Sequence, residues 1–380
     1  MIYLDHAATT PVDSAVLDEM LPYFREAYGN PSSLHSAGQE AKFALDNARD
    51  RVAALLHARP SEIIFTSGGT EADNLALRGV AGQAPPDRRR LIVSSVEHEA
   101  ILETAAALEA QGWVVARLPV DDQGIVHPES LRDAMRRGTA LVSVMAANNE
   151  VGAMQPIAEL AQIAHAGGAL FHTDAVQAVG AMDVSPSAWG VDLLSLSGHK
   201  IYGPKGIGAL WVRGGLRVAP QVTGGGQERE RRSGTENVPA IVGLGKACEL
   251  AGERIAAGEP ERLRQLRDIL IRGVLETVPA AILTGHPTER LPNHASFCFP
   301  GVEGEPILLN LDFAGIAASS GSACSTGAIE PSHVLLAMGF AREIANGALR
   351  LTLGRANTED DVAAVLAVLP GIVNRLRSLG

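Results

Sequence analysis

The chain has 380 residues, 46% of them hydrophobic, and its formal net charge is −11. This length predicts two or three domains with a large buried core. The acidic balance argues against direct binding to nucleic acid or to a membrane surface, because both favour a basic patch on the protein. It leaves room for a local site that binds a small anion.

The three cysteines are Cys248, Cys298 and Cys324, and none of them belongs to a CxxC pair. Such a sparse, odd-numbered set predicts neither a disulfide framework nor a cysteine zinc site. No signal peptide is expected, and no apolar run reaches the roughly 18 residues that a spanning helix needs. We therefore expect a protein of the reducing cytoplasm.

Short apolar runs alternate with helical segments between about residues 60 and 215. Strands are expected at 62–67, 90–96, 112–118, 140–146, 169–175, 192–197 and 208–213. Helices are expected at 37–57, 71–80, 100–109 and 157–165. This alternation predicts an α/β fold with a mainly parallel central sheet.

The pattern changes after residue 250, where a long helix is expected to lead into a smaller α+β region. A last helix is expected over residues 358–379, interrupted at Pro370. We therefore expect a large domain over residues 15–255. A small domain would combine residues 1–14 with residues 256–380.

Lys200 directly follows the strand expected at 192–197 and is surrounded by small and glycine residues. A lysine at the end of a buried strand can form a Schiff base with a carbonyl cofactor, provided that its pKa is lowered. The alternative is a solvated lysine beside a glycine turn.

Asp174 ends the strand expected at 169–175, and Gln177 follows shortly after it. A buried carboxylate needs a cationic partner, and the protonated pyridine nitrogen of pyridoxal phosphate (PLP) is such a partner. The alternative is a helix N-cap, which is a common use of aspartate at a strand-to-helix junction.

The stretch "FTSGGTEADN" brings Gly68, Gly69 and Thr70 from a strand to the start of a helix. Free N–H groups and the helix dipole make such a turn suitable for a phosphate, although a simple glycine turn capped by Thr70 is the alternative.

His98 ends another strand and can stack on a cofactor ring or relay protons, or it is only a polar residue with its hydrogen bonds satisfied. The histidines show no metal-ligand spacing, so no metal is expected.

Cys324 lies in a Gly- and Ser-rich loop, where an exposed thiol can act as a nucleophile or be incidental. Cys248 and Cys298 have helical and strand neighbours and are expected in the core.

Arg350 alternates with apolar residues and is expected to point inward, either to bind a substrate carboxylate or to form a structural ion pair. Arg355 can share either role.

An anion-binding turn, a histidine, a buried aspartate, a lysine and an arginine together indicate a PLP enzyme that acts on an amino acid. In these residues the sequence resembles the cysteine desulfurases of the NifS/IscS type, within the fold-type-I PLP enzymes. The resemblance extends nearly end to end. It is carried by "YLDHAATTPVD", "GNPSSLHSAG", "FTSGGTEADN", "VEHEA", "NNEVGAMQP", "HTDAVQAVG", "SGHKIYGPKGIGALWVR", "GGGQERERRSGTEN", "SSGSAC" and "PSHVLLAMG".

The resemblance implies that Lys200 binds PLP covalently and later acts as the base at the substrate Cα. His98 is then expected to stack on the pyridine ring, Asp174 to pair with its nitrogen and Gln177 to reach its phenolic oxygen. The residues expected at the phosphate are Gly69, Thr70, Ser197, His199 and Thr235 of the partner subunit.

The resemblance further implies that Asn149 contacts the cofactor and, with Arg350, holds the substrate carboxylate. Cys324 is expected to take sulfur from L-cysteine as a persulfide, leaving L-alanine. The implied partners are a second subunit in a homodimer and a sulfur acceptor, either an iron–sulfur scaffold or a sulfur carrier.

Three other functions stay open from the residues alone: an aminotransferase, a selenocysteine lyase and a non-enzymatic module that binds an anion or dinucleotide. An aminotransferase has no need of a loop thiol. Six residues separate Cys324 from Pro331, which resembles the family's subgroup with the longer cysteine loop, and this resemblance favours cysteine desulfuration over selenocysteine lyase activity. The non-enzymatic alternative gives Lys200, Asp174 and Arg350 no shared purpose.

Overall fold

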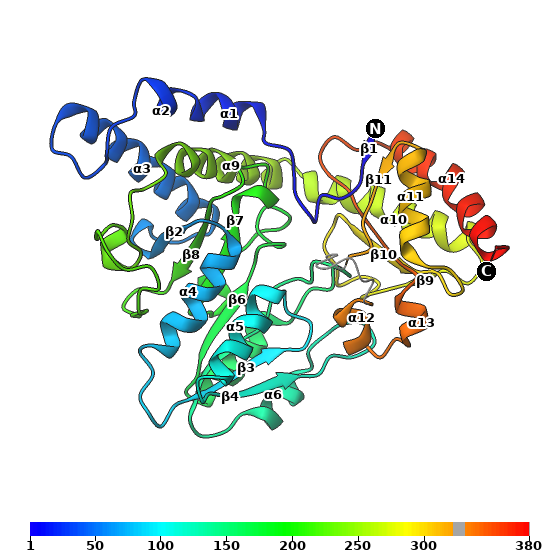
Figure 1. The fold of residues 1–380 in the computed structure, drawn as a ribbon, viewed down its shortest axis with the longest axis horizontal. Helices are drawn as coiled ribbons and strands as arrows, with labels where there is room; N and C mark the ends of the chain where they lie inside the picture. Colours follow the sequence, from blue (N-terminus) through cyan, green and yellow to red (C-terminus); the bar gives the residue numbers. More distant parts are fainter. Residues whose placement is uncertain (322–330, 380) are drawn as a thin grey trace.

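The computed structural model describes residues 1–321 and 331–379 and shows two bodies side by side, each with its own sheet (Figure 1). The larger body contains a seven-stranded sheet with the order β2-β8-β7-β6-β5-β3-β4. Its strands are β2 (Ile63–Thr66), β3 (Arg90–Ser94), β4 (Val114–Leu118), β5 (Thr139–Ser143), β6 (Leu170–Asp174), β7 (Leu193–Ser197) and β8 (Gly208–Val212). Strands β3 to β7 are parallel and β8 is antiparallel to both of its neighbours, so the predicted α/β fold with a mainly parallel sheet is confirmed.

Helices cover both faces of this sheet because its side chains are apolar on both sides. On one face, α4 (Gly69–Ala81) and α5 (Glu99–Glu109) pack on residues such as Ile64 and Leu210. On the other face, α3 (Ser36–Leu55), α7 (Ile157–Ala166) and α9 (Val238–Ala256) contribute to a cluster that includes Phe65 and Trp211. The short helices of this body are α1 (Ser14–Met20), α2 (Pro22–Arg25), α6 (Pro128–Ala134) and α8 (Pro186–Trp189).

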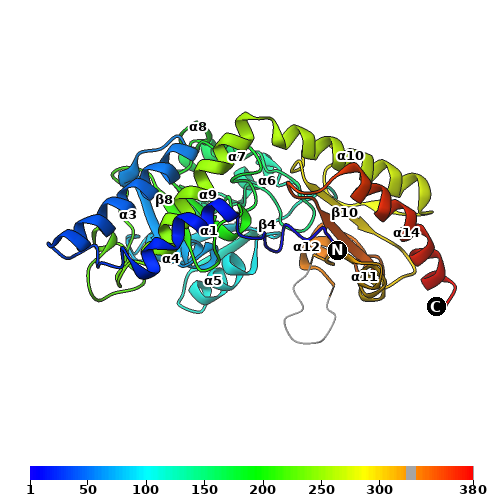
Figure 2. The ribbon, with the colours of Figure 1, turned by 90° about the horizontal axis from the view of Figure 1, so that it is seen from above.

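The smaller body contains a three-stranded antiparallel sheet with the order β12-β10-β9. Its strands are β9 (Ile282–Leu283), β10 (His294–Cys298) and β12 (Ala348–Thr352). Its helices are α10 (Glu259–Thr277), α11 (Gly304–Phe313), α12 (His333–Ala337), α13 (Arg342–Ala345) and α14 (Glu359–Arg377), of which α10 and α14 lie together in Figure 2. The chain's first strand, β1 (Ile2–Tyr3), pairs with β11 (Ile316–Ala317), which attaches the N-terminus to this body.

Two details differ from the expectations drawn from the sequence. The long helix expected near residue 255 is two helices, since Gly258 adopts a left-handed conformation (φ 83°) between α9 and α10. The interruption expected at Pro370 is wrong, because α14 continues through that residue. Buried residues on both sides of it, Leu369 and Ile372, pack in the apolar core and offset the hydrogen bond that proline cannot donate.

The cysteine expectations for the core are confirmed: Cys248 is 1% exposed and Cys298 is fully buried. Burial raises the pKa of each thiol to about 12, so neither is a nucleophile at neutral pH. Cys324 lies outside the described residues. No helix in the described part of the chain is long and apolar enough to cross a membrane.

The division into residues 15–255 and residues 1–14 with 256–380 remains our proposal. Two separate apolar clusters support it, since one centres on the seven-stranded sheet and the other joins Leu4 to side chains of α10, β10, β12 and α14.

Candidate active site

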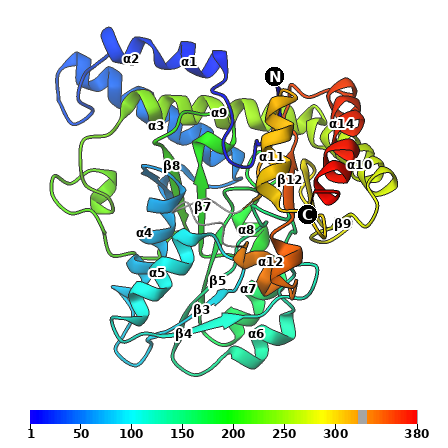
Figure 3. The same ribbon diagram turned by 45° about the vertical axis from the view of Figure 1, so that its right-hand side comes forward.

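A cavity of about 380 Å³ opens at the carboxyl ends of β6 and β7 and reaches β12 of the smaller body. Figure 3 shows the two bodies next to each other, with β7 in the larger body and β12 in the smaller one. Ten residues singled out from the sequence line the cavity: Gly69, Thr70, His98, Asn149, Asp174, Gln177, Ser197, His199, Lys200 and Arg350. Thr235, which is exposed, is not among the described residues that line it.

Lys200 ends a tight 3-10 turn, Gly198–Lys200, that directly follows β7. Its Nζ donates hydrogen bonds to the backbone carbonyls of Ala7 and Ala8. Burial, reinforced by the positive charge of Arg350, lowers the pKa of the lysine from 10.5 to about 8. Lys200 is therefore a partly buried amine held in place by the N-terminal segment, which is unlike a solvated surface lysine.

Asp174, at the end of β6, is only 5% exposed, and its Oδ1 accepts a hydrogen bond from Val176 N at 2.8 Å. Within residues 1–321 and 331–379 it forms no ion pair. Burial raises the pKa of Asp174, while His98 and Lys200 oppose this rise. A buried carboxyl without a direct cationic partner fits a ligand that brings a positively charged ring nitrogen.

The turn before α4 offers backbone donors to the cavity. The first hydrogen bond within the helix runs from Ala72 N to Gly68 O at 3.1 Å, so the N–H groups at the helix start have no carbonyl of the preceding turn to bind. A Cβ at Gly69 would lie 2.9 Å from Val176 Cγ2, so the absence of a side chain allows this close approach. This geometry fits a phosphate group.

Ser197 and His199 bring polar atoms to the same region from the end of β7. Burial, with the nearby charges of Lys200 and Lys205, lowers the pKa of His199 to about 4. Its ring is therefore neutral at pH 7, and its Nδ1 lies 3.2 Å from Thr9 Oγ1. A neutral ring has one N–H group to donate to an anion.

His98 has its Nδ1 hydrogen bond satisfied, and its position also leaves the cofactor-stacking role open. It is the N-cap of α5, where its Nδ1 accepts a hydrogen bond from Ala100 N at 3.0 Å, and its ring also lines the cavity. Gln177 donates from Nε2 to Ala7 O at 3.0 Å, which is the carbonyl that also accepts from Lys200. Both side chains are thus oriented by backbone groups.

Arg350 is 4% exposed and forms the structural ion pair that was one of its two possible roles. Its Nη2 donates to Asp5 Oδ1 and its Nη1 to the carbonyl of Asn149, both at 2.8 Å. Its Nε is buried and has no hydrogen-bond partner among the described residues, so the guanidinium keeps a free donor. The structure is therefore compatible with both roles of Arg350, the structural ion pair and the binding of a substrate carboxylate.

Arg355 does not line the cavity in the part of the chain that the structure describes. Its Nη1 pairs with Asp13 Oδ2, and its guanidinium lies 4.4 Å from the ring centroid of Tyr202. Arg254 of α9 binds the same Asp13 carboxylate. Asp13 thus links Arg355 to α9, separately from Arg350.

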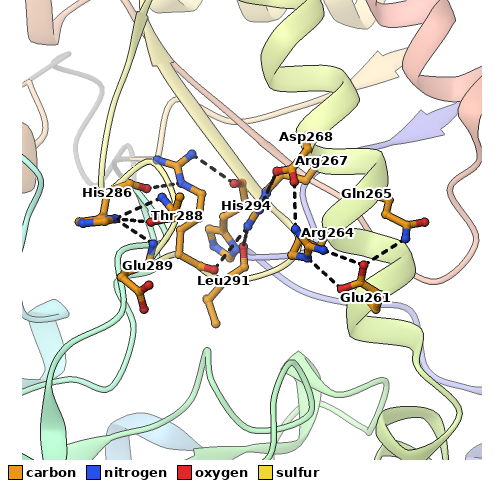
Figure 4. A network of polar contacts seen from close by, with 11 residues as sticks. Glu261, Arg264, Gln265, Arg267, Asp268, His286, Thr288, Glu289, Leu291 and His294 are labelled. Atoms are coloured by element: carbon orange, nitrogen blue, oxygen red, sulfur yellow. Dashed lines mark hydrogen bonds and ion pairs between the residues drawn. The ribbon is translucent and has the colours of Figure 1, made fainter.

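A polar network attaches the strand that pairs with β12 to helix α10 (Figure 4). Arg267 of α10 donates from Nη1 to Leu291 O at 2.8 Å, and its other nitrogens bind Asp268. Arg290 donates from Nε to His286 O at 2.6 Å. These bonds hold the segment that leads into β10, whose Ser296 is the register partner of Arg350.

Three acidic residues at or near the cavity were not singled out from the sequence: Asp5, Asp73 and Glu97. Asp73 and Glu97 are 1% and 0% exposed. Asp73 lies inside the quoted stretch "FTSGGTEADN", yet nothing in that local pattern shows which face of the helix it occupies. No group of three or more His, Cys, Asp or Glu side chains in the described residues is arranged to hold a metal ion.

Comparison with known proteins shows which family this chain belongs to. The class-V aminotransferase model matches residues 2–365. A protein of Methanosarcina thermophila named cysteine desulfurase IscS is 51% identical over all of this chain and 93% of its own length. Cysteine desulfurase of Gluconacetobacter diazotrophicus is 50% identical over all of this chain and 94% of its own.

Solved structures agree with these relatives. A NifS-like protein matches with a TM-score of 0.92 and 40% identity, covering 99% of this chain and 100% of its own. SspA in complex with cysteine matches with a TM-score of 0.81 and 34% identity over 93% of this chain and 99% of its own. The chain therefore belongs to the class-V aminotransferase family, among the cysteine desulfurases of the NifS/IscS type.

Proposed function

We propose that this protein is a PLP-dependent cysteine desulfurase, which converts L-cysteine to L-alanine and transfers the sulfur to Cys324. The observation that carries the proposal is one cavity lined by Lys200, Asp174 and Arg350. These three side chains offer a covalent attachment point, a partner for a ring cation and a donor for a carboxylate. The chain's relatives at about 50% identity bear the name of this activity.

PLP is the cofactor of this family, and the residues of the cavity fit it. Asp174 would hold the pyridine nitrogen, and the turn at Gly69 and Thr70 would hold the phosphate together with Ser197 and His199. When bound, the cofactor withdraws electrons from the substrate's Cα and makes its proton acidic. The protein's contribution is to orient the substrate and to move protons.

Arg350 and Asn149 would bind the substrate carboxylate, because the buried Nε of Arg350 faces no other partner in the described residues. Lys200 would take the proton from Cα. With a pKa of about 8, an appreciable fraction of this amine is neutral at physiological pH, as a base must be.

Cys324 would receive the sulfur as a thiolate. A bond forms between Cys324 Sγ and the substrate sulfur, and the carbon–sulfur bond breaks with its electron pair left on carbon. Protonation of that carbon gives alanine and leaves a persulfide on the enzyme. Ser319 and Gly321, which shortly precede Cys324, line the cavity, and this supports its assignment as the sulfur acceptor.

The enzyme is proposed to work as a homodimer. Thr235, expected at the phosphate, is exposed and does not line the cavity among the described residues of its own chain. The segment that contains it leads into Val238 of α9, which packs against α3. Several large apolar side chains of this region are exposed: Leu17, Leu21, Phe24, Tyr28, Leu34 and Phe43. A second copy would cover them and accept Thr235 into its own cavity.

The persulfide is proposed to pass to an acceptor protein in the cytoplasm, either an iron–sulfur scaffold or a sulfur carrier. Relatives with the name IscS support a sulfur-supplying role. The two cysteines that the structure describes are free thiols, which suits a reducing compartment.

Lys200→Ala tests the proposed function, and Lys205→Ala is the control, because Lys205 is an exposed lysine five residues further along the chain. The control should keep the visible absorption of bound PLP and the release of alanine from L-cysteine. Lys200→Ala should lose both. Substantial alanine release by Lys200→Ala would refute the assignment of this lysine.

A further inference from the structure

A second carboxyl, that of Asp73 on α4, lies in the same cavity as Asp174. Asp73 is 1% exposed and lines the cavity. Its Oδ1 is buried and has no hydrogen-bond partner among the described residues. In that part of the chain, the one ion-pair contact of Asp73 is with His172, whose Nε2 lies 3.8 Å from this oxygen, beyond hydrogen-bond distance.

His172 does not offer Asp73 a positive charge. The ring is fully buried, and its two nitrogens lie 2.8 Å from Ser143 Oγ and 3.0 Å from Ser195 Oγ. Burial lowers the pKa of His172 to about 3, so the ring is neutral at pH 7. An ionised Asp73 would therefore be an unpaired buried charge near a second carboxylate, which is strongly unfavourable.

The groups around Asp73 come from several elements. Asp174 is on β6, Ser195 is on β7, and Glu97 follows β3. Burial, followed by the negative charge of Asp174, raises the pKa of Asp73, and the Ser195 hydroxyl opposes this. Burial also raises the pKa of Glu97 to about 8, so Glu97 is mostly protonated at pH 7 and adds little charge. Two ionised carboxylates that line one buried cavity would repel each other, so this arrangement favours a single charge on the pair Asp73 and Asp174.

We propose, resting on the proposed function, that Asp73 is protonated at neutral pH and is a positioning residue that leaves Asp174 as the charged carboxylate facing the cofactor. The two carboxyls are not equivalent, because Asp174 has a backbone N–H donor at 2.8 Å and lies near His98 and Lys200. A hydrogen bond to a carboxylate and nearby positive charge both favour its ionised form. Among the described residues no lysine or arginine forms an ion pair with Asp73, so Asp73 is the carboxyl that holds the proton.

Infrared difference spectroscopy tests the protonation directly. The spectrum of the purified wild-type protein minus that of Asp73→Asn at pH 7 should contain the C=O stretch of a protonated carboxylic acid. Labelling aspartate with ¹³C at its side-chain carboxyl should shift this band, which separates it from the acid of Glu97. A difference spectrum with carboxylate bands alone would overturn the proposal.

The positioning role is tested by PLP affinity, measured by equilibrium dialysis of the apo-protein. Asp73→Asn keeps a neutral side chain of the same shape, and its dissociation constant for PLP should stay within about threefold of wild type. Asp73→Ala leaves a cavity beside His172, and should bind PLP about tenfold more weakly. Equal losses in both variants, or none in Asp73→Ala, would overturn the role.

The two variants also separate this proposal from the proposed function. If wild-type protein binds no PLP, the proposed function and the positioning role both fail, while the infrared band still decides whether Asp73 is protonated. If PLP binds normally but the acid band is missing, only the present inference fails.

Discussion

The lowered pKa of Lys200 predicts the pH range in which its amine can react with PLP. Only the neutral amine attacks the aldehyde of PLP, and the pKa falls from 10.5 to about 8. A difference of about 2.5 units raises the neutral fraction at pH 7 by about 300-fold, from roughly 0.03% to roughly 9%. The rate of PLP attachment to the apo-protein should therefore rise with pH, pass its midpoint near 8 and level off above it.

Arg350→Met perturbs this midpoint in a known direction. Arg350 is the second-largest cause of the lowered pKa, after burial, and Asp5 opposes it. Removing Arg350 also frees Asp5 from its ion pair, so both changes should move the midpoint upward, by about one unit. Burial should keep the midpoint below 10.5.

The assay follows the visible absorption of the PLP–protein adduct after rapid mixing at a series of pH values. The same series with Nα-acetyl-lysine corrects for the ionisation of PLP itself. A wild-type midpoint near 10.5, the ordinary value for lysine, would refute the argument from burial. An unchanged midpoint in Arg350→Met would refute the contribution of the arginine.

Three further substitutions test other parts of the site. Asp174→Asn removes the charge that would hold the ring nitrogen, and should weaken PLP binding about 10- to 100-fold in dialysis; unchanged binding would contradict its role. Arg350→Lys keeps a charge but loses the planar pair of donors, and should raise KM for L-cysteine about tenfold or more while PLP affinity is unchanged; an equal loss of PLP affinity would show a structural role instead. Arg267→Met removes buried hydrogen bonds to the segment before β10 and should lower the free energy of unfolding in urea by about 1–3 kcal/mol. Its control is Arg264→Met, at an exposed position of the same helix, which should change the free energy of unfolding by less than about 0.5 kcal/mol. Equal effects of these two would contradict the importance of the buried hydrogen bond from Arg267 to Leu291 O (Figure 4).

The elements of the larger body could be predicted from the sequence because its strands are short apolar runs and its helices follow them regularly. All seven expected strands occur within two residues of their expected starts and within three of their expected ends. Helix α6 (Pro128–Ala134) was not expected, since it has only one fully buried apolar residue, Leu131, and thus no clear apolar period. Pro370 was expected to interrupt α14 because the local rule for proline takes no account of tertiary packing.

The candidate site could be predicted where a residue stands at the end of its own strand, as Asp174 and Lys200 do. It could not be predicted where the contact joins distant segments. Asp5 reaches Arg350, and the carbonyl of Ala7 reaches Lys200, only because β1 pairs with β11 of the smaller body. Likewise, the burial of Asp73 depends on how α4 packs on the sheet.

The measurement that tests the central claim most directly is the yield of alanine and sulfide from L-cysteine in the presence of a reductant, for wild type and for Cys324→Ala loaded with the same amount of PLP. The account predicts equal amounts of both products from wild type and neither from the variant. Equal product formation by both proteins would contradict the claim that Cys324 accepts the sulfur. The absence of alanine from PLP-loaded wild type would contradict the proposed function itself.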